Sequence, residues 1–434
     1  MTENPRFNAL VTLLTILALG LAPHASIASV IQPSSSDFSD TSDRDRSISK
    51  VRVLESVPNG TSLDHSNIPQ THQGWEKVLN RSDTEIVIGT FYMTNKDGSK
   101  QSKIIDLVRR KARNGVRVRV ISDSGFFSTY PDVLRSLSGE PNTEVRVLNL
   151  SDRTGGVMHA KYMVVDSRYF YVGSANFAWK SLEHIREVGL AGNDPRVARK
   201  LLSVFDVDWL LSGRSDTTQW ADWKSLQEQR SYGDLKEDTL PEERVTGGIM
   251  PVATPPKITP ESVMPTREAL IRMINTAEDE IFLDLYGYSV TNRYTDIYLD
   301  DLDRALRRAS TRGVDVHVLV GEWGMEEPGQ SFMKSLAPWP NITVKVISLP
   351  IDKEGYRSYS RVSHTKLMIV DGDYAWVGSA NWKPGYFSES RNVGLVTTRW
   401  KPVSTLKRFF LTAWTGPYSA SVQPGKQYSV PYHE

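Results

Sequence analysis

Apolar and polar residues follow one another along the chain in two alternating patterns. In the first, apolar side chains dominate short stretches that predict strands, at residues 51–58, 85–92, 116–121, 245–252, 280–287 and 314–319. In the second, apolar residues recur every three to four positions, as from Ile104 to Val108 and from Leu299 to Leu306, which indicates helices. Gly115 and Gly313 follow these segments and are typical helix stop signals. Strands that alternate with helices predict an α/β fold.

The second half of the chain repeats the pattern of the first. The segment HAKYMVVD at 159–166 returns as HTKLMIVD at 364–371, and GSAN at 173–176 returns at 378–381, both 205 positions later. Phe205 and Trp209 recur at the same spacing as Phe410 and Trp414. This duplication predicts two similar α/β domains, at residues 51–243 and 244–434, with the polar, acidic stretch at 233–244 between them.

The first fifty residues differ from the rest. The apolar run at 9–22 is too short to span a bilayer, which takes about 20 residues, but it fits the core of a signal peptide followed by small residues at 25–28. We expect a signal peptide at 1–28 and a secreted protein, or one in the lumen of a secretory or lysosome-like compartment. An uncleaved signal anchor is the alternative. Residues 29–50, rich in Ser and Asp, are expected to form a disordered leader.

Composition excludes several classes of chemistry. The chain of 434 residues has 52 Lys and Arg against 51 Asp and Glu, so any polyanion must bind through a local pocket rather than through global charge. It has no Cys, which excludes disulfides, zinc–thiolate sites, iron–sulfur clusters and a cysteine nucleophile. No cluster of Asp and Glu is spaced for a two-metal site, and we expect neither a metal nor another cofactor.

The repeated His-X-Lys segments carry the candidate chemistry. Side chains two positions apart on a strand face the same side, so His159 points with Lys161 and His364 with Lys366. The Asp that follows each Lys by five positions faces away, and we assign it a structural role at the end of the strand. The downstream Gly-Ser-X-Asn offers hydroxyl and amide donors to an anion. Asn176 and Asn381 join the His and Lys pairs as catalytic candidates, and the supporting residues are Asp166, Asp371, Ser174, Ser379 and Asn392.

Two imidazoles and two ammonium groups that meet in one pocket suit a phosphodiester. One His attacks phosphorus and becomes a phosphohistidine. The other protonates the leaving oxygen and then activates water. The Lys and Asn pairs stabilise charge on the non-bridging oxygens, as a metal does in other phosphoryl enzymes.

These repeated segments resemble the duplicated HKD signature of the phospholipase D superfamily, over nearly the whole chain after residue 50. A closer resemblance is to the branch with the lysosomal phospholipase D3 and D4 exonucleases and the poxvirus envelope proteins, and it is carried by residues 54–58, 169–176, 179–182, 208–209, 381–389 and 414–418. The resemblance implies a pseudo-twofold pair of α/β sandwich domains with one active site at their junction, and no metal requirement. This chain departs from that branch in lacking disulfides and in keeping an intact Asp371.

One position breaks the symmetry of the repeat. Glu187 lies 28 residues after His159, whereas Asn392 stands 28 residues after His364. In the superfamily, a carboxylate here resembles the group that orients a catalytic His, and a carboxylate-paired imidazole better tolerates the charge of a phosphohistidine. Glu187 could reach His159 in its own half or His364 across the junction, or serve only in a salt bridge on a strand. Analogy with superfamily members favours His159 as nucleophile, while crossed pairing would favour His364.

Substrate contacts are expected from aromatic residues that follow strands or motifs, since bases stack on such faces, although ordinary packing at the domain junction is the alternative. The substrate-binding candidates are Tyr92, Tyr286, Trp179, Trp382 and Glu389, with Tyr386 beside them. We expect a 5′ exonuclease on single-stranded DNA or RNA. The alternatives are a phospholipase D or transphosphatidylase on phospholipids, and a non-catalytic binding protein with the same fold. A homodimer is compatible with the sequence, and no obligatory protein partner is readable from it.

Overall fold

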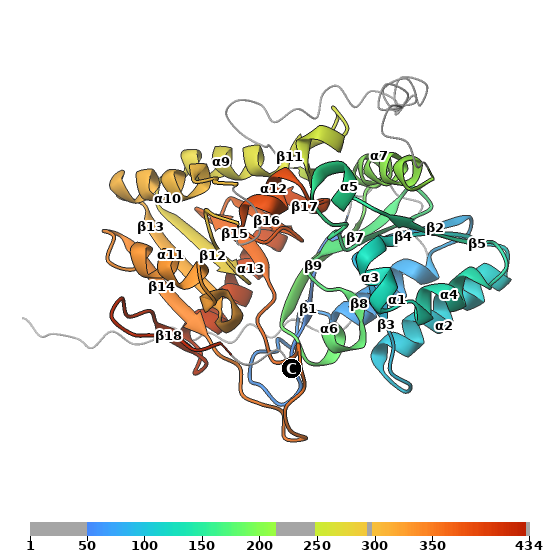
Figure 1. The fold of residues 1–434 in the computed structure, drawn as a ribbon, viewed down its shortest axis with the longest axis horizontal. Helices are drawn as coiled ribbons and strands as arrows, with labels where there is room; N and C mark the ends of the chain where they lie inside the picture. The colour runs from blue at the N-terminus through green and yellow to red at the C-terminus, as the bar shows by residue number, and fades with distance from the viewer. Residues whose placement is uncertain (1–49, 214–247, 293–296, 431–434) are drawn as a thin grey trace, which may run out of the picture. The chain divides into compact units, whose positions relative to one another are not determined.

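The computed structural model describes residues 50–213, 248–292 and 297–430 (Figure 1). Residues Ser49–Glu434 group into one compact unit. The expected signal peptide, the leader up to residue 49 and the domain boundary near residue 243 lie outside the described residues. Within the described part of the chain, no helix is both long and apolar enough to cross a membrane.

Two large sheets form the framework. The first has the strand order β1 (Val51–Ser56), β9 (Glu187–Asn193), β7 (Tyr169–Gly173), β6 (Tyr162–Val165), β2 (Glu85–Thr90), β4 (Arg117–Asp123) and β5 (Thr143–Leu148). The second has the order β11 (Met264–Pro265), β10 (Ile249–Thr254), β17 (Asn392–Thr397), β16 (Tyr374–Gly378), β15 (Lys366–Val370), β12 (Glu280–Leu285), β13 (Asp315–Gly321), β14 (Ile342–Ile347) and β18 (Ser419–Ser421). Apart from edge strands β11 and β18, the two orders are equivalent, as the duplication predicts. The short strands β3 (Met93–Thr94) and β8 (Phe177–Ala178) pair separately.

Helices cover the outer face of each sheet (Figure 1). On the first sheet they are α1 (Thr71–Asn80), α2 (Lys100–Arg113) and α4 (Asp132–Ser138); on the second they are α9 (Thr266–Thr276), α10 (Asp301–Thr311) and α11 (Gly329–Leu336). Shorter helices in the connections are α3 (Ser124–Thr129), α5 (Ser151–Thr154), α6 (Trp179–Glu183) and α12 (Pro384–Ser388). Each sheet is therefore buried on its outer side by its own half of the chain.

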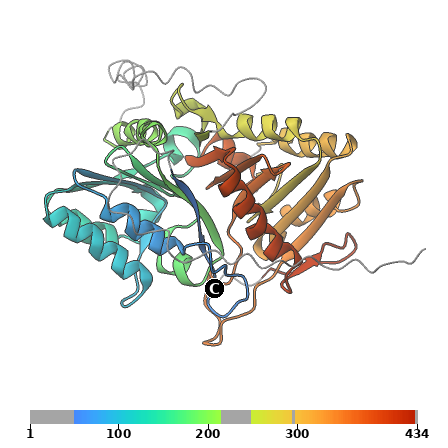
Figure 2. The ribbon, with the colours of Figure 1, turned by 180° about the vertical axis from the view of Figure 1, so that it is seen from behind.

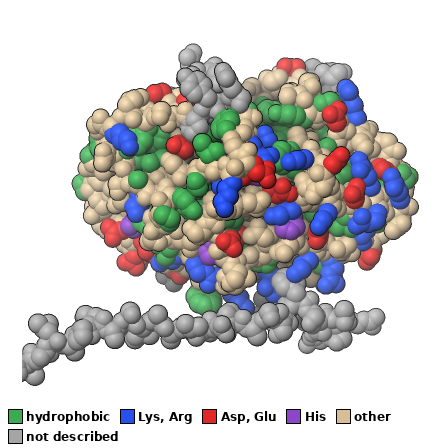
Figure 3. All heavy atoms as spheres, turned by 90° about the horizontal axis from the view of Figure 1, so that it is seen from below, with side chains coloured by type: hydrophobic (Ala, Val, Ile, Leu, Met, Phe, Trp, Pro, Cys, Tyr) green, Lys and Arg blue, Asp and Glu red, His purple; other side chains and the backbone are tan. Residues whose placement is uncertain are grey.

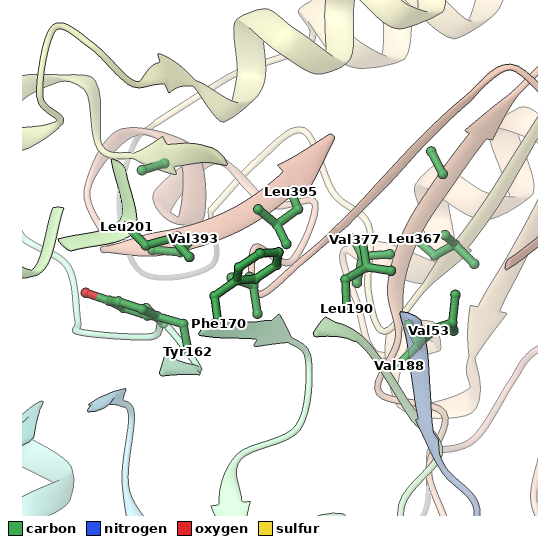
Figure 4. Packing of buried hydrophobic residues seen from close by; sticks show 14 of the residues in the cluster. Val53, Tyr162, Phe170, Val188, Leu190, Leu201, Leu367, Val377, Val393 and Leu395 are labelled. Carbon is green, nitrogen blue, oxygen red and sulfur yellow. The ribbon is translucent and has the colours of Figure 1, made fainter. Parts of the chain in front are cut away.

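The inner faces of the two sheets share one hydrophobic core. Val188 and Leu190 of the first sheet belong to the same buried cluster as Val377 and Leu395 of the second (Figure 4). The helices α7 (Pro195–Ser212) and α13 (Trp400–Thr415) also contribute to this cluster. Figure 2 shows α13 running along the seam between the halves. The prediction of an α/β fold built from two similar domains is confirmed, because the two large sheets have equivalent strand orders.

Element boundaries shift from the sequence expectations by a few residues. The strands expected from residues 85 and 280 begin at Glu85 and Glu280. The helix expected from Leu299 begins two residues later, because Asp300 stands at its N-terminal boundary. The strand expected from residue 245 begins at Ile249, and residues 245–247 lie outside the described part.

Candidate active site

The two His-X-Lys segments come together at the junction of the halves, and each is tied to the opposite half. The backbone N–H of His159 donates to the carbonyl of Arg391 (2.9 Å), and that of His364 donates to the carbonyl of Arg186 (2.9 Å). The expectation that these residues lie inside strands needs correction. His159 and Lys161 precede β6, and β15 begins only at Lys366, because the backbone around each His pairs across the junction instead.

Arg186 and Arg391 anchor these crossed connections, and neither was predicted from the sequence. Each guanidinium is fully buried and pairs with an acid of the opposite half, Arg186 with Asp284 (2.6 Å) and Arg391 with Asp208 (2.8 Å). A buried ion pair is tolerated only where further hydrogen bonds satisfy its groups, and here backbone carbonyls accept from both arginines. Their separation of 205 positions, shared with the motifs, is the signal that could have revealed them.

The two histidines differ in the group that meets Nδ1. Nδ1 of His364 lies 3.0 and 2.9 Å from the two carboxylate oxygens of Glu187, so Glu187 reaches across the junction. Nδ1 of His159 lies 3.0 Å from Oδ1 of Asn392. Ser379 donates to the same Oδ1, which marks this atom as an acceptor and His159 Nδ1 as the donor. Neutral His159 and His364 therefore both keep the lone pair on Nε2.

Both motif lysines are buried in the centre of this junction. The ammonium groups of Lys161 and Lys366 donate to the carbonyls of His159 and His364, at 2.6 Å in the second case. Each also lies 5.0 Å from an aromatic ring centre, Phe91 for Lys161 and Tyr286 for Lys366. These contacts hold each lysine ammonium group in a defined position.

Burial and mutual repulsion shift the protonation of the centre. Burial and then the lysine charges hold the pKa of His159 and of His364 well below the usual histidine range. Burial lowers the pKa of Lys366 to about 7, against the attraction of Glu187. Burial and then Lys366 hold the pKa of Lys161 well below its usual range. Burial raises the pKa of Glu187 to about 7. A bound anion would relieve this repulsion, so the arrangement suits a phosphoryl group.

Asp166 and Asp371 cap strands away from the histidines. The Asp166 carboxylate accepts from the backbone N–H groups of Asp83, Thr84 and Glu85, at 2.7 to 3.0 Å. Asp371 accepts in the same way from the N–H groups of residues 278–280. Both carboxylates thus hold the first residues of β2 and β12 against the turn that follows the motif.

In the Gly-Ser-X-Asn segments, the Ser side chains bind neighbouring strands, and the Asn side chains keep a carbonyl oxygen without a protein partner among the described residues. Ser174 and Ser379 accept from the N–H groups of Val188 and Val393, and they donate to the Val188 carbonyl and to Oδ1 of Asn392. In this structure their hydroxyls join neighbouring strands, and a role as anion donors stays a prediction. Asn176 donates from Nδ2 to the Tyr92 hydroxyl (3.3 Å). Within the described structure, Oδ1 of Asn176 and of Asn381 is buried without a protein partner.

Aromatic rings pack edge-on against both histidines. Tyr286 lies 4.9 Å from His364 between ring centres, and Tyr386 lies 4.9 Å from His159. Phe91 also contacts His159, at 4.8 Å, and was missed, although the offset of 195 that aligns the preceding strands pairs it with Tyr286.

The other substrate-binding candidates lie elsewhere. Trp382 is only 2% exposed and packs in the outer core with Tyr288, which corrects its expected role as a stacking face. Trp179 is half-buried and packs edge-on against His184 (5.4 Å). Glu389 is half-buried, and its backbone carbonyl accepts from Thr154. The described residues contain no group of three His, Asp or Glu placed to hold a metal ion.

Comparison with known proteins gives a consistent result. Residues 76–209 and 270–414 match the family described as "Cardiolipin synthase, PLD-like domain", one match in each half. The chain is 30% identical over 400 residues to the human (Homo sapiens) 5'-3' exonuclease PLD3, covering 85% of this chain and 79% of that protein. It is 27% identical over 380 residues to the mouse (Mus musculus) 5'-3' exonuclease PLD4, covering 80% and 74%. Phosphatidylserine synthase from Haemophilus influenzae Rd KW20 shares the fold, with a TM-score of 0.54 at 13% identity over 81% of this chain and 85% of that one.

Proposed function

The chain belongs to the phospholipase D superfamily, and from this premise we propose that it is a 5′ exonuclease on single-stranded DNA or RNA. It is a phosphodiesterase of this superfamily. The exonuclease names of its relatives support the choice of substrate. The observation that carries the proposal is the crossed pairing of Glu187 with His364, which makes one reaction centre out of two motifs.

The reaction proceeds in two in-line displacements. Nε2 of His364 attacks phosphorus, the bond from phosphorus to the leaving ester oxygen breaks, and His159 gives that oxygen its proton. A water then loses a proton to His159 and attacks phosphorus, which releases His364 and the phosphorylated product. Glu187 stabilises the positive imidazole of the phosphohistidine. Because Glu187 pairs with His364 of the opposite half, His364 is favoured over His159 as the nucleophile.

The lysines supply the positive charge that this chemistry needs. Lys161 and Lys366 lie buried at the junction, where their charges stabilise the non-bridging oxygens more strongly than they would in water. Because fixed ammonium groups occupy this role, the proposed reaction requires no metal ion. Asn176 and Asn381 add buried amide groups, each with an Oδ1 that has no protein partner among the described residues.

The test compares labelled single-stranded DNA, single-stranded RNA and phosphatidylcholine vesicles, each with and without excess EDTA. We expect stepwise release of nucleotides from the 5′ end, blocked by a 5′ modification and unaffected by EDTA. The variants His159→Ala and His364→Ala serve as inactive controls. Hydrolysis of phosphatidylcholine with no action on nucleic acid would overturn the substrate assignment, and a loss of activity in EDTA that Mg²⁺ restores would overturn the metal-free mechanism.

A further inference from the structure

One connection departs from the repeat beside the reaction centre. In the first half, residues 149–158 link β5 to His159; in the second half, the longer segment 348–363 links β14 to His364. We call residues 348–363 the long loop. In Figure 1 it is the orange segment that projects at the bottom of the molecule. The second half thus carries six extra residues directly before its catalytic histidine.

Large apolar side chains on the long loop face solvent. Ile351 is 65% exposed, Tyr356 is 50% exposed and Tyr359 is 52% exposed. Single exposed apolar residues are common, but three within nine positions of one connection point to an interaction site.

The backbone of the long loop is held in a fixed and costly shape. Tyr359 and Arg361 both adopt left-handed conformations, with φ of 53° and 58°, which cost on the order of 1 kcal/mol each for residues with a side chain. Bonds to the first half hold them there. The Arg361 N–H donates to the His184 carbonyl (2.8 Å), its guanidinium donates to the Asn59 carbonyl (2.7 Å), and Lys180 donates to the Ser358 carbonyl (2.7 Å).

A small apolar cluster lies between the long loop and the nucleophile. Tyr359 packs edge-on against Trp323, with ring centres 5.5 Å apart. Trp323 shares a small buried cluster with Val362, and Tyr286 packs against that cluster. Tyr286 in turn lies edge-on to His364 (4.9 Å). The exposed Tyr359 ring is therefore supported by the same small cluster against which Tyr286, the ring beside His364, also packs.

We infer that the long loop is a base-binding subsite, in which the exposed ring of Tyr359 stacks on a base of the single-stranded substrate near the cleaved phosphodiester, with Tyr356 as a second ring on the same loop. This inference rests on the proposed function. Stacking on aromatic rings binds any base, because every base has a flat face, and it adds affinity without a strongly basic surface. The face in Figure 3 carries Lys and Arg side chains interspersed with Asp and Glu, so stacking supplies binding that the mixed charge does not.

A nucleic acid fits the long loop better than a lipid surface does. Ile351 is followed directly by Asp352, Lys353 and Glu354, and insertion of Ile351 into a bilayer would carry these charges toward the hydrocarbon. Tyrosine rings, by contrast, stack on bases while their hydroxyls stay in water.

The experiment combines loop variants with abasic substrates. Hydrolysis kinetics of a single-stranded oligonucleotide are measured for the parent, Tyr359→Ala, Tyr356→Ala and Tyr359→Phe, and for Trp400→Ala, which removes an aromatic side chain that is 76% exposed at the start of α13. The same proteins are tested on oligonucleotides with one abasic position, moved through the first four nucleotides.

For Tyr359→Ala we expect KM to rise about tenfold with little change in kcat, as loss of one stacked base predicts. Tyr359→Phe keeps the parent KM because it keeps the ring. When the abasic site lies at the position that stacks on Tyr359, the KM of the parent should equal that of Tyr359→Ala. An unchanged KM in Tyr359→Ala, an equal advantage at every abasic position, or an effect confined to phosphatidylcholine vesicles would overturn the subsite. A parent that cleaves bis(p-nitrophenyl) phosphate but no oligonucleotide would instead overturn the proposed function.

Discussion

Glu187 and Asn392 occupy equivalent positions in the two repeats, and each meets Nδ1 of the histidine in the opposite half. Only the carboxylate can balance a positive imidazole, since the Asn392 amide is neutral. The two histidines are thus chemically different, although their backbone settings match. This single difference assigns His364 the covalent step and His159 the proton transfers in the proposed mechanism.

Replacing the carboxylate should slow one step selectively. In Glu187→Gln we expect formation of the phosphohistidine to slow about 100-fold, because loss of a group that orients and supports an imidazole has effects of this size. In Asn392→Ala, hydrolysis of the adduct should slow more than its formation. Single-turnover kinetics separate the two rates. Equal effects of both variants on both steps would contradict the division of roles.

The shifted pKa values predict the response of the reaction to pH. Lys366 must be charged and His159 must be protonated in the free enzyme for the first step, and both groups lose their protons as pH rises. Because burial holds the pKa of His159 well below the usual histidine range, kcat/KM should already fall as pH rises through that pKa. It should fall more steeply above pH 7, because Lys366, with a pKa lowered to about 7, then loses its proton as well. Measurement of kcat/KM from pH 4 to 9 checks this. A value that still rises toward pH 9 would show that neither proton is needed.

At the residue scale, the sequence predicts the site residues that occur twice at the same spacing. It does not predict contacts between side chains from opposite halves. His159, Lys161, His364 and Lys366 were predicted because the same spacing occurs twice. The partner of Glu187 remained open, because it depends on how two strands from different halves approach each other. The residues next to Trp382 in the sequence do not show whether its side chain is buried. It was therefore expected near the substrate, although it packs in the core.

At the scale of the elements, the turn after each motif strand contains an Asp whose carboxylate binds the start of a neighbouring strand. Asp166 and Asp371, both with positive φ, accept several backbone N–H bonds from the beginning of β2 or β12. The sequence predicted that these side chains face away from the histidines, because they stand at odd spacing from the lysines. It could not predict their partners, which lie more than 80 residues earlier in the chain.

Loss of one such carboxylate should affect stability rather than chemistry. In Asp371→Ala we expect the free energy of unfolding to fall by about 1.5–3 kcal/mol, because the backbone N–H groups of residues 278–280 lose hydrogen bonds to a charged acceptor. Urea denaturation followed by circular dichroism measures the change. Asp373→Ala, an exposed acid in the same turn, is the matched control. If Asp371→Ala keeps parent stability but loses kcat, Asp371 has a part in the chemistry.

Across the whole molecule, the halves interlock instead of merely touching. The sheets share one core, α7 and α13 lie in that core, and Arg186 and Arg391 each pair with an acid from the opposite half. Duplication in the sequence predicted two similar layers, since both repeats carry the same element order. The buried arginine pairs were not predicted, because Asp208 and Asp284 do not occupy equivalent positions in the two repeats.

This interlocking predicts that the halves unfold together. Asp208→Ala leaves the fully buried Arg391 without its counter-charge and should cost about 3–5 kcal/mol. Because the Arg391 carbonyl also holds the His159 backbone, activity should fall in the fraction that stays folded. Calorimetry of parent and variant should each give one transition, the variant at lower temperature. Two separate transitions in the parent would contradict a shared core.

The central claim is that one histidine, His364, carries the phosphoryl group during turnover. Rapid acid quench during hydrolysis of single-stranded DNA, followed by peptide mapping under conditions that preserve phosphohistidine, tests it most directly. We expect phosphate on His364 alone, reduced in Glu187→Gln and absent in His364→Ala. Phosphate on His159 would reverse the assignment of the two histidines. No adduct under any quench, with inversion at a chiral phosphorothioate, would contradict the two-step mechanism itself, since two in-line displacements give net retention.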